Sequence, residues 1–286
     1  MRDITNSMFT INTYGGSETK KTCYINGKKY MVKFPDPVRK NNKDISYVNN
    51  QYSEYISCKI FELFGIDVQK TELVKCYIDG KEKIAVMCED FLNDDEMLIE
   101  FKTLSYSLST EIIYTNELKD IFDMVKELDT LTDKNEFEDK FWDIFIVDTL
   151  IGNVDRHLGN WGIVAKFNTS KLSPVYDCGS ALHPLLSETE IKELLKNGEL
   201  KNISINLKTA YKLNGKTLNY LDIYKNMPEK LKNSLKRMHS KISLDAIKNI
   251  IYSTPTLTDE MKEFYYKTIE IRKNEIIDKY YKEINI

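Results

Sequence analysis

The sequence predicts an α+β protein of two lobes, a small β-rich one followed by a larger, mostly helical one. Over about the first ninety residues, short runs with β propensity alternate with turn signals and surround one helical segment. From about residue 93, apolar residues recur mainly at helical spacing. A chain of 286 residues with 42% hydrophobic residues can bury a core in each lobe. We therefore expect the lobes to comprise residues 1–92 and 93–286.

The first lobe is expected to contain two hairpins with a helix between them. Asn26-Gly27 and Asp79-Gly80 are dipeptides favoured in tight turns. Apolar residues recur at helical spacing over 48–63, and this segment stops at Gly65. The strands are expected in the runs 23–25, 30–34, 72–78 and 83–88.

The second lobe is expected to be mainly helical. Phe137, Phe141 and Phe145 share one face of a helix that leads into a polar loop. Ser187 and Glu190 form a capping box that opens another helix. Two short strands, at 163–164 and 172–176, and a long amphipathic helix between Pro255 and Tyr280 complete the expected elements.

Composition and charge narrow the classes of function. A formal net charge of -3 predicts neither a broad phosphate-binding surface nor an acidic tail. The five cysteines are scattered without a C-x-x-C pair, which is typical of reduced, mostly buried thiols in a cytoplasmic protein. No apolar run approaches the ~18 residues needed to span a bilayer, and the N-terminus has no secretory signal. We expect a cytoplasmic protein with no membrane span and no direct nucleic-acid binding.

The clearest chemical motif is the run 153–160, Asn-Val-Asp-Arg-His-Leu-Gly-Asn, followed by Asp177 at the end of an expected strand. A carboxylate such as Asp155 can orient an attacking hydroxyl, while Asn160 and Asp177 offer oxygen ligands to Mg²⁺. The simpler alternative is that Asp155 and Asn160 only cap a turn. The combination with Asp177 favours phosphoryl transfer from ATP with Mg²⁺, and with it a kinase whose catalytic residues are Asp155, Asn160 and Asp177.

Lys33 and Glu54 form a second candidate pair. Lys33 lies in a predicted strand, where side chains alternate between faces, and an inward lysine needs a counter-charge or a phosphate. Glu54 lies on the helix that follows. A Lys–Glu pair that positions the α- and β-phosphates is common in kinases. The alternative is a lysine at a strand edge with a solvated glutamate.

Two more segments complete the predicted nucleotide site. A pair of adjacent glycines precedes the first hairpin and allows backbone N–H groups to face an anion. At the end of the run 83–88, backbone groups can pair with the adenine edge and an aromatic ring can cover it. The alternatives are an ordinary turn and an exposed connection without ligand contacts. Together the segments contribute Gly15, Gly16, Ser17, Thr19, Lys20, Lys21, Glu89, Asp90 and Phe91.

The order of residues in the loop points to a family. Arg156 and His157 follow the aspartate here, whereas the catalytic loop of protein kinases places His and Arg before it. The Asp-Arg-His-x-x-Asn order resembles phosphoinositide kinases and the HipA family. Nearly the whole chain resembles the HipA C-terminal domain, most specifically in 148–180. Further matching segments are 14–21, 32–34, the Glu54 helix ending at Gly65-Ile66, 88–92, 213–216, 219–220 and Ile271-Arg272.

The resemblance implies a bilobal, protein-kinase-like fold that phosphorylates serine or threonine with Mg-ATP. It implies that Asp155 is the catalytic aspartate, that Asn160 and Asp177 bind magnesium, and that Lys33 binds phosphate. By the same resemblance the glycine loop covers the nucleotide and residues 89–91 meet the adenine. His157 is expected to contact a phosphate or to brace the loop, and Tyr176 is a further candidate beside the nucleotide.

The resemblance also concerns partners. Family members can be toxins of toxin–antitoxin pairs, and some autophosphorylate in the glycine loop, where Thr13 and Ser17 are the nearest hydroxyls here. Full-length HipA proteins carry a further N-terminal subdomain before that loop, whereas this sequence begins almost at the loop. A HipA-type antitoxin contact through that subdomain is therefore not expected, and a separate small protein could supply it. The expected substrate is a protein that carries Ser or Thr. Two alternatives stay open: a phosphoinositide or small-molecule kinase, and a catalytically inactive kinase fold that acts as a binding module.

Overall fold

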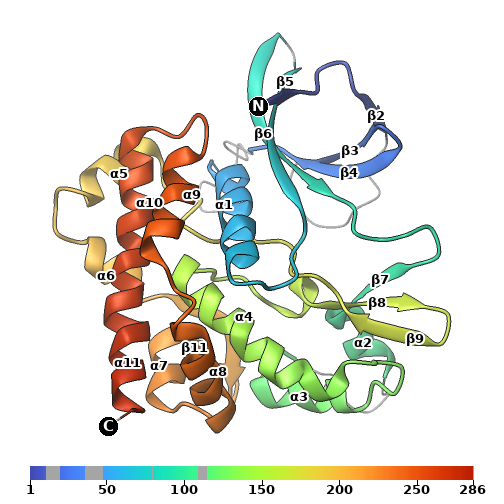
Figure 1. The fold of residues 1–286 in the computed structure, drawn as a ribbon, viewed down its shortest axis with the longest axis vertical. Helices are drawn as coiled ribbons and strands as arrows, with labels where there is room; N and C mark the ends of the chain where they lie inside the picture. Colours follow the sequence, from blue (N-terminus) through green and yellow to red (C-terminus); the bar gives the residue numbers. More distant parts are fainter. Residues whose placement is uncertain (11–19, 36–47, 79, 109–114, 286) are drawn as a thin grey trace.

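The computed structural model describes residues 1–10, 20–35, 48–78, 80–108 and 115–285. Its architecture is the α+β, bilobal arrangement that the sequence predicts, with a curled sheet above a larger helical lobe (Figure 1). The candidates Gly15, Gly16, Ser17 and Thr19, and the proposed modification sites Thr13 and Ser17, lie outside the described residues.

A six-stranded sheet in the order β1-β5-β6-β4-β3-β2 forms the first lobe. The β3–β4 turn contains Asn26 and Gly27, whose φ angles of 51° and 78° are those the expected hairpin turn requires. β1 pairs with β5 in parallel, and the other neighbours are antiparallel. The strands are β1 (Arg2–Asp3), β2 (Met8–Thr10), β3 (Lys20–Ile25), β4 (Lys28–Lys33), β5 (Thr71–Ile78) and β6 (Lys81–Glu89).

The two faces of this sheet have different partners. The outer face carries a small core of its own, built from Ile4, Cys23, Val32, Phe34, Val74, Cys76, Ala85 and Met87. The inner face packs on α1 (Asn50–Leu63), which contacts β5 and β6. Alternation along β4 therefore directs Val32 outward and Lys33 inward, toward α1 and the second lobe.

Helix α4 lies at the centre of the second lobe (Figure 1). Phe141 and Phe145 of α4 contact Trp142, Trp161 and Tyr211 in an aromatic core. The strands are β7 (Met97–Glu100), β8 (Gly162–Lys166), β9 (Thr169–Leu172), β10 (Lys208–Leu213) and β11 (Lys216–Asn219). The helices are α2 (Phe101–Ser107), α3 (Leu118–Lys126), α4 (Phe137–Ile151), α5 (Glu188–Leu194), α6 (Leu200–Ile205), α7 (Tyr220–Lys225), α8 (Glu229–His239), α9 (Leu244–Ser253), α10 (Asp259–Arg272) and α11 (Lys279–Glu283), with 3-10 turns η2 (Lys134–Glu136) and η3 (Leu158–Asn160) and a π-helical turn η4 (Lys273–Asp278).

Most expected elements are confirmed, with one correction. The capping box of Ser187 and Glu190 opens α5, and α10, η4 and α11 form the long terminal helix. The strand expected at 172–176 is wrong, because β9 already ends at Leu172 and pairs with β8 as a hairpin. Residues 173–176 form no named strand, and Val175 makes only an isolated bridge with Val68. Pro174 lacks the N–H that a continuous ladder would use.

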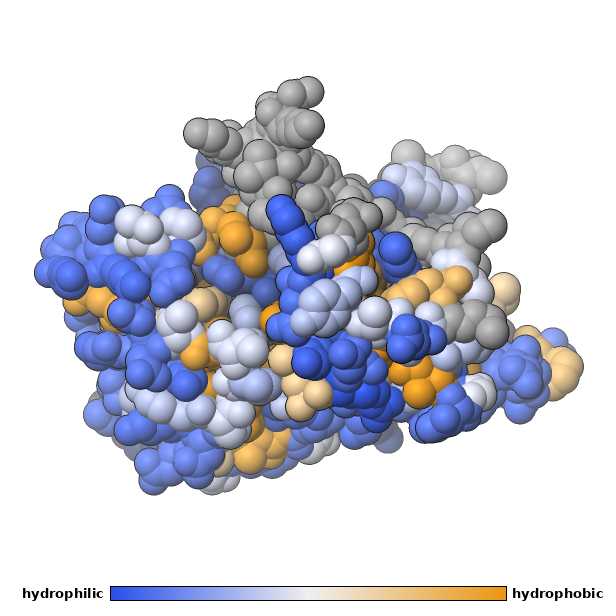
Figure 2. Space-filling model, turned by 90° about the horizontal axis from the view of Figure 1, so that it is seen from above, coloured by the Kyte–Doolittle hydropathy of each residue, from blue (hydrophilic) through white to orange (hydrophobic). Residues whose placement is uncertain are grey.

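The surface view from above is mostly hydrophilic, with separate small apolar patches (Figure 2). Within the described part of the chain, no helix combines the length and apolar character needed to cross a membrane. The cysteines Cys23, Cys58, Cys76, Cys88 and Cys178 are all free and buried, as the sequence predicts.

Candidate active site

The loop with Asp155 begins where α4 ends. Gly152 caps α4 in the left-handed region, with φ of 67°. A Cβ at this position would lie 2.9 Å from the guanidinium of Arg272, whose Nε donates to the Leu150 carbonyl at 2.7 Å. A glycine is therefore required both by the backbone and by the close packing. The end of α4 is thereby fixed directly before Asp155.

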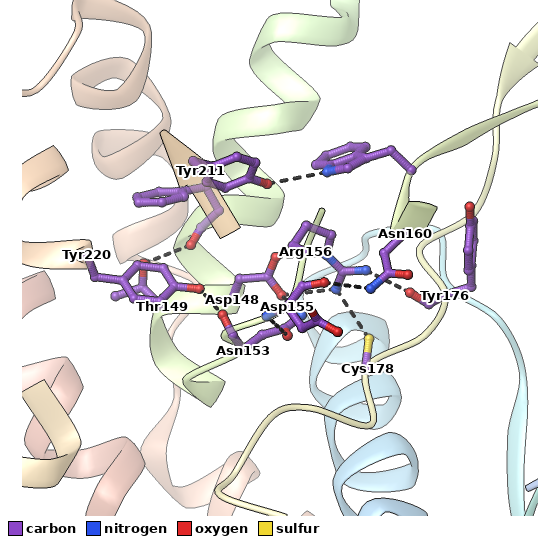
Figure 3. Close-up of polar contacts among 12 residues, drawn as sticks. Asp148, Thr149, Asn153, Asp155, Arg156, Asn160, Tyr176, Cys178, Tyr211 and Tyr220 are labelled. Atoms are coloured by element: carbon purple, nitrogen blue, oxygen red, sulfur yellow. Dashed lines mark hydrogen bonds and ion pairs between the residues drawn. The ribbon is translucent and has the colours of Figure 1, made fainter. Parts of the chain in front are cut away.

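A buried ion pair between Arg156 and Asp148 supports the loop from inside the second lobe. Arg156 donates from Nε to Asp148 Oδ2 at 2.9 Å and from Nη2 to Asp148 Oδ1 at 3.0 Å. Its Nη1 also donates to the carbonyl of Tyr176 at 2.7 Å, so one side chain joins α4, the loop and the segment before Asp177 (Figure 3). Although burial opposes the charged form, Asp148 raises the pKa of Arg156 well above its usual value. Arg156 is therefore a charged structural residue.

Asparagine side chains hold the rest of the loop. Asn153 donates from Nδ2 to Asp148 Oδ1 at 2.9 Å, while its own Oδ1 accepts from the Asp155 N–H at 3.2 Å. Asn160 donates from Nδ2 to the Asp155 carbonyl at 2.6 Å. His157 Nδ1 accepts from the Gly159 N–H at 3.0 Å, which agrees with the bracing role considered for this histidine. Hydrogen bonds thus hold the backbone of Asp155 on both sides, while its side chain is 46% exposed.

Lys33 joins Glu54 to Asp177. Its Nζ lies 3.0 Å from Glu54 Oε2 and 2.6 Å from Asp177 Oδ1, and Lys33 and Glu54 are fully buried. This confirms the inward orientation of Lys33 and its pairing with Glu54. Burial raises the pKa of Asp177, but Lys33 outweighs it and holds this pKa below its usual value. Asp177 is consequently a carboxylate, and its side chain stays 43% exposed.

The backbone around Asp177 is unusual. Asp177 has a φ of 56°, in the left-handed region that aspartate tolerates better than most residues. The next N–H, that of Cys178, donates to Glu54 Oε1 at 3.1 Å. Glu54 therefore uses one oxygen for Lys33 and the other for the chain beside Asp177. This contact couples α1 directly to the position of Asp177.

The structure separates the two lysines of the glycine segment. Lys20 is opposite Lys33 in the β3–β4 ladder and lies on the inner face, where its charge contributes to lowering the pKa of Asp177. Lys21 is opposite Val32 on the outer face, with its Nζ 5.4 Å above the ring of Phe9. Strand alternation thus places Lys20 at the site and Lys21 away from it. Including Lys21 among the nucleotide-binding residues is wrong.

The carboxylates expected near the adenine are engaged by the first hairpin. Lys28 Nζ lies 2.8 Å from Glu89 Oε1, and Lys29 Nζ lies 3.0 Å from Asp90 Oδ2. The Asp90 N–H also donates to the Lys29 carbonyl at 2.9 Å. These contacts fix the end of β6 against β4. The carboxylates of Glu89 and Asp90 thus shape the connection between the lobes.

Phe91 and Tyr176 supply aromatic surface beside this connection. Their ring centroids are 6.0 Å apart, and the Tyr176 hydroxyl donates to the Gly159 carbonyl at 3.1 Å. The Glu89 carbonyl already accepts from Gln69 Nε2 at 3.0 Å. Among the described residues, the backbone N–H and carbonyl of Phe91 have no hydrogen-bond partner. Phe91 therefore has backbone groups available to a ligand.

Asn160 and Asp177 fit a magnesium ion by their chemistry. Asn160 donates its amide N–H to the Asp155 carbonyl, and its Oδ1 has no partner among the described residues. Asp177 uses Oδ1 for Lys33, and its Oδ2 likewise has no partner in the described part of the chain. A neutral oxygen and a carboxylate oxygen are a ligand set that Mg²⁺ accepts alongside phosphates and water.

Sequence reasoning missed the residues that support the loop. Asp148 and Asn153 contact each other, and the Tyr220 hydroxyl donates to the Asn153 carbonyl. These three residues support the loop from within the protein. Asp148 lies in the segment that most resembles HipA, and it precedes Asn153 by five residues and Arg156 by eight. That spacing around a helix end was the available signal. Tyr220 comes from a distant helix, and nothing local indicates its contact.

Comparisons with known proteins place the chain in a family and give its fold. The family described as HipA-like C-terminal domain matches residues 13–246. The chain is 33% identical over 274 residues to the serine/threonine-protein kinase CtkA of Helicobacter pylori, covering 93% of this chain and 82% of CtkA. The crystal structure of the proinflammatory kinase CtkA from Helicobacter pylori superposes with a TM-score of 0.85 at 29% identity, over 99% of each chain. A chain of the Shewanella oneidensis toxin–antitoxin complex of HipA, HipB and operator DNA shares the fold, with a TM-score of 0.57 at 13% identity over 95% of this chain and 67% of that one.

Proposed function

Because the chain belongs to the HipA-like C-terminal domain family and is a protein kinase, we propose that it transfers the γ-phosphoryl group of Mg-ATP to serine or threonine hydroxyls of a protein. The observation that carries this proposal is the Glu54–Lys33–Asp177 chain of contacts above the Asp155 loop. It supplies a fixed cation for the phosphates and a partly exposed carboxylate, Asp177, for the metal, while the loop supplies Asp155 for the substrate hydroxyl.

In this proposal the residues act mainly by position and charge. Lys33, held by Glu54, contacts the phosphates, and Lys20 adds positive charge on the same face. Asp155 accepts a hydrogen bond from the substrate hydroxyl and aims it at the phosphorus. Since the Asp155 backbone is held by Asn153 and Asn160, the carboxylate need not reorganise when the substrate arrives.

Asn160 and Asp177 would hold Mg²⁺, which when bound neutralises phosphate charge. Phe91 would offer its backbone groups to the adenine edge, and its ring with that of Tyr176 would border the base. His157 stays a loop-bracing residue in this proposal. We also propose that residues 1–92 and 93–286 act as the two lobes that enclose the nucleotide.

The test is incubation of the purified protein with γ-labelled ATP and Mg²⁺, alone and with a cell lysate. We expect label on the protein or on a lysate protein, and none with Asp155→Ala or Asp177→Ala. Asp155→Ala should unfold near the wild-type temperature, because its side chain is 46% exposed. Asp177→Ala should stay folded, because the buried Lys33 keeps Glu54 as an ion-pair partner. Substantial labelling by both variants would contradict the assignment. Label on lipid or small-molecule acceptors alone would favour the alternative kinases, and ATP binding without turnover an inactive binding module.

Three finer statements belong to the same proposal. Autophosphorylation would modify Thr13 or Ser17, and mass spectrometry after incubation with Mg-ATP would contradict this if neither residue gained phosphate. We expect a cytoplasmic reaction. HipB accompanies HipA in the Shewanella oneidensis complex, and we propose that a separate regulatory protein of that antitoxin-like kind binds this chain. Copurification from the native host with the chain as bait would test for it.

A further inference from the structure

Behind the Lys33–Glu54 pair, a carboxylate and two thiols converge from α1 and from the segment after Asp177. One ligand atom each of Glu54, Cys58 and Cys178 lie within 4.8 Å of one another, and all three residues are fully buried. Cys58 Sγ lies 3.9 Å from Glu54 Oε1. We propose that this cluster, the Glu54–Cys58–Cys178 site, binds a zinc ion or another thiophilic divalent cation.

The site is arranged by contacts that need no metal. Glu54 and Cys58 are four residues apart on α1 and therefore project from the same face of the helix. Cys178 is brought to them by its own N–H, which donates to Glu54 Oε1 at 3.1 Å. Its Sγ accepts a hydrogen bond from Arg156 Nη2 at 3.4 Å. The donor atoms are thus gathered before any ion arrives.

The donor set and its dimensions suit zinc. Zinc takes thiolate sulfur at about 2.3 Å and carboxylate oxygen at about 2.0–2.2 Å, so its ligand atoms lie roughly 3.4–3.8 Å apart. The present spread of up to 4.8 Å therefore requires each atom to move by about an ångström or less. Glu54 can offer Oε1 to the metal while Oε2 stays with Lys33. Water or a nearby side chain would complete a tetrahedral site.

Charge balance favours the exchange. One Zn²⁺ replaces the thiol protons of Cys58 and Cys178, so two protons leave as one dication enters and the buried cluster keeps its net charge. The neighbouring cations are already compensated, Lys33 by Asp177 and Glu54, and Arg156 by Asp148. No new uncompensated charge is buried, which is the condition that most often excludes ions from protein interiors. Bound metal would tie α1 to the chain beside Asp177.

Metal binding at the Glu54–Cys58–Cys178 site can be measured spectroscopically, without a kinase assay. We would titrate tag-free, reduced protein with Cd²⁺ in the presence of Mg²⁺ and record the ultraviolet charge-transfer absorption of thiolate–Cd²⁺. The matched control is Cys76→Ser, since Cys76 is an equally buried thiol in the separate core on the outer face of the sheet. The test variants are Cys58→Ser and Cys178→Ser, with Cys58→Ala as a second substitution at the same position.

We expect wild type and Cys76→Ser to bind one Cd²⁺ per chain with a two-thiolate absorption. Cys58→Ser, Cys58→Ala and Cys178→Ser should lose at least about half of that absorption and bind more than tenfold more weakly, since each removes one of two thiolates. Zn²⁺ should raise the thermal unfolding midpoint of wild type and of Cys76→Ser only. Absence of the absorption in wild type, or its full retention in Cys58→Ala and Cys178→Ser, would overturn the inference.

Discussion

The buried pair of Asp148 and Arg156 yields a quantitative prediction about the Asp155 loop. Both side chains are 2% exposed, and the guanidinium donates to both carboxylate oxygens. Removing one partner leaves the other as an uncompensated buried charge, which typically costs about 3–5 kcal/mol. We therefore expect Asp148→Leu and Arg156→Met each to lower the free energy of unfolding by about 3–5 kcal/mol. The expected loss comes from the unpaired buried charge and not from the apolar surface that each substitution removes.

The double variant tests the cause of that loss. Because the second substitution removes the charge that the first left unpaired, the double variant should lose at least about 2 kcal/mol less than the sum of the single losses. The assay is urea unfolding followed by the fluorescence of Trp142 and Trp161, which lie in the core around α4. Arg237→Met is the control.

The control separates burial from charge. Arg237 pairs with Asp143 at 2.7 Å, but its side chain is 41% exposed, so its loss should cost less than about 1 kcal/mol. Additive losses in the double variant would refute the reasoning, because they would mean that the unpaired charge carries no cost. Equal losses for Arg237→Met and Arg156→Met would refute it as well, since burial would then make no difference.

Three further predictions concern positions around the loop. Gly152→Ala should cost about 2–4 kcal/mol in unfolding free energy, because it combines a positive φ with a clash against Arg272, whereas Gly198→Ala, with a φ of 79° and open space, should cost only about 1 kcal/mol. Tyr220→Phe should lower the free energy of unfolding by about 1–3 kcal/mol, because a buried loop carbonyl loses its donor. It should also reduce kcat while leaving the KM for ATP nearly unchanged, and an unchanged kcat would contradict a positioning role. Burial lowers the pKa of His183 to about 3 from 6.5, so between these values the unfolded state binds a proton that the folded state does not, and stability falls by up to about 1.4 kcal/mol per pH unit as the pH drops below 6.5. Urea midpoints at neutral and mildly acid pH should show that component in wild type and not in His183→Gln.

Elements with a strong local signal could be predicted from the sequence. The Asn26-Gly27 hairpin, α1 and α4 follow from turn chemistry and apolar spacing, and strand alternation was enough to direct Lys33 inward. The same alternation separates Lys20 from Lys21, so this error could have been avoided. It arose from reading the glycine segment as a loop as far as residue 21, although β3 already begins at Lys20.

Long-range contacts could not be predicted in the same way. The left-handed φ of Asp177 occurs beside a contact between distant elements, that of the Cys178 N–H with Glu54, which local sequence does not indicate. The structural role of Arg156 follows from its ion pair with Asp148, which the position of Arg156 after Asp155 does not indicate. Such roles follow from which side chains the fold brings together, and a single sequence states only which side chains exist.

The acidic residues of the site divide into two groups by exposure. Asp148 is 2% exposed and fully paired, whereas Asp155 and Asp177 are 46% and 43% exposed. A carboxylate that must meet a hydroxyl or a cation has to remain accessible, while one that shapes a loop is most effective when water is excluded. Substitution of Asp155 should therefore remove activity at little cost in stability, and substitution of Asp148 should reduce both. Substitution of Asp177 should remove activity with an intermediate cost in stability, because Lys33 loses one of its two carboxylate partners and keeps Glu54. Stability and activity measured on the same variants thus distinguish chemical from structural carboxylates in this loop.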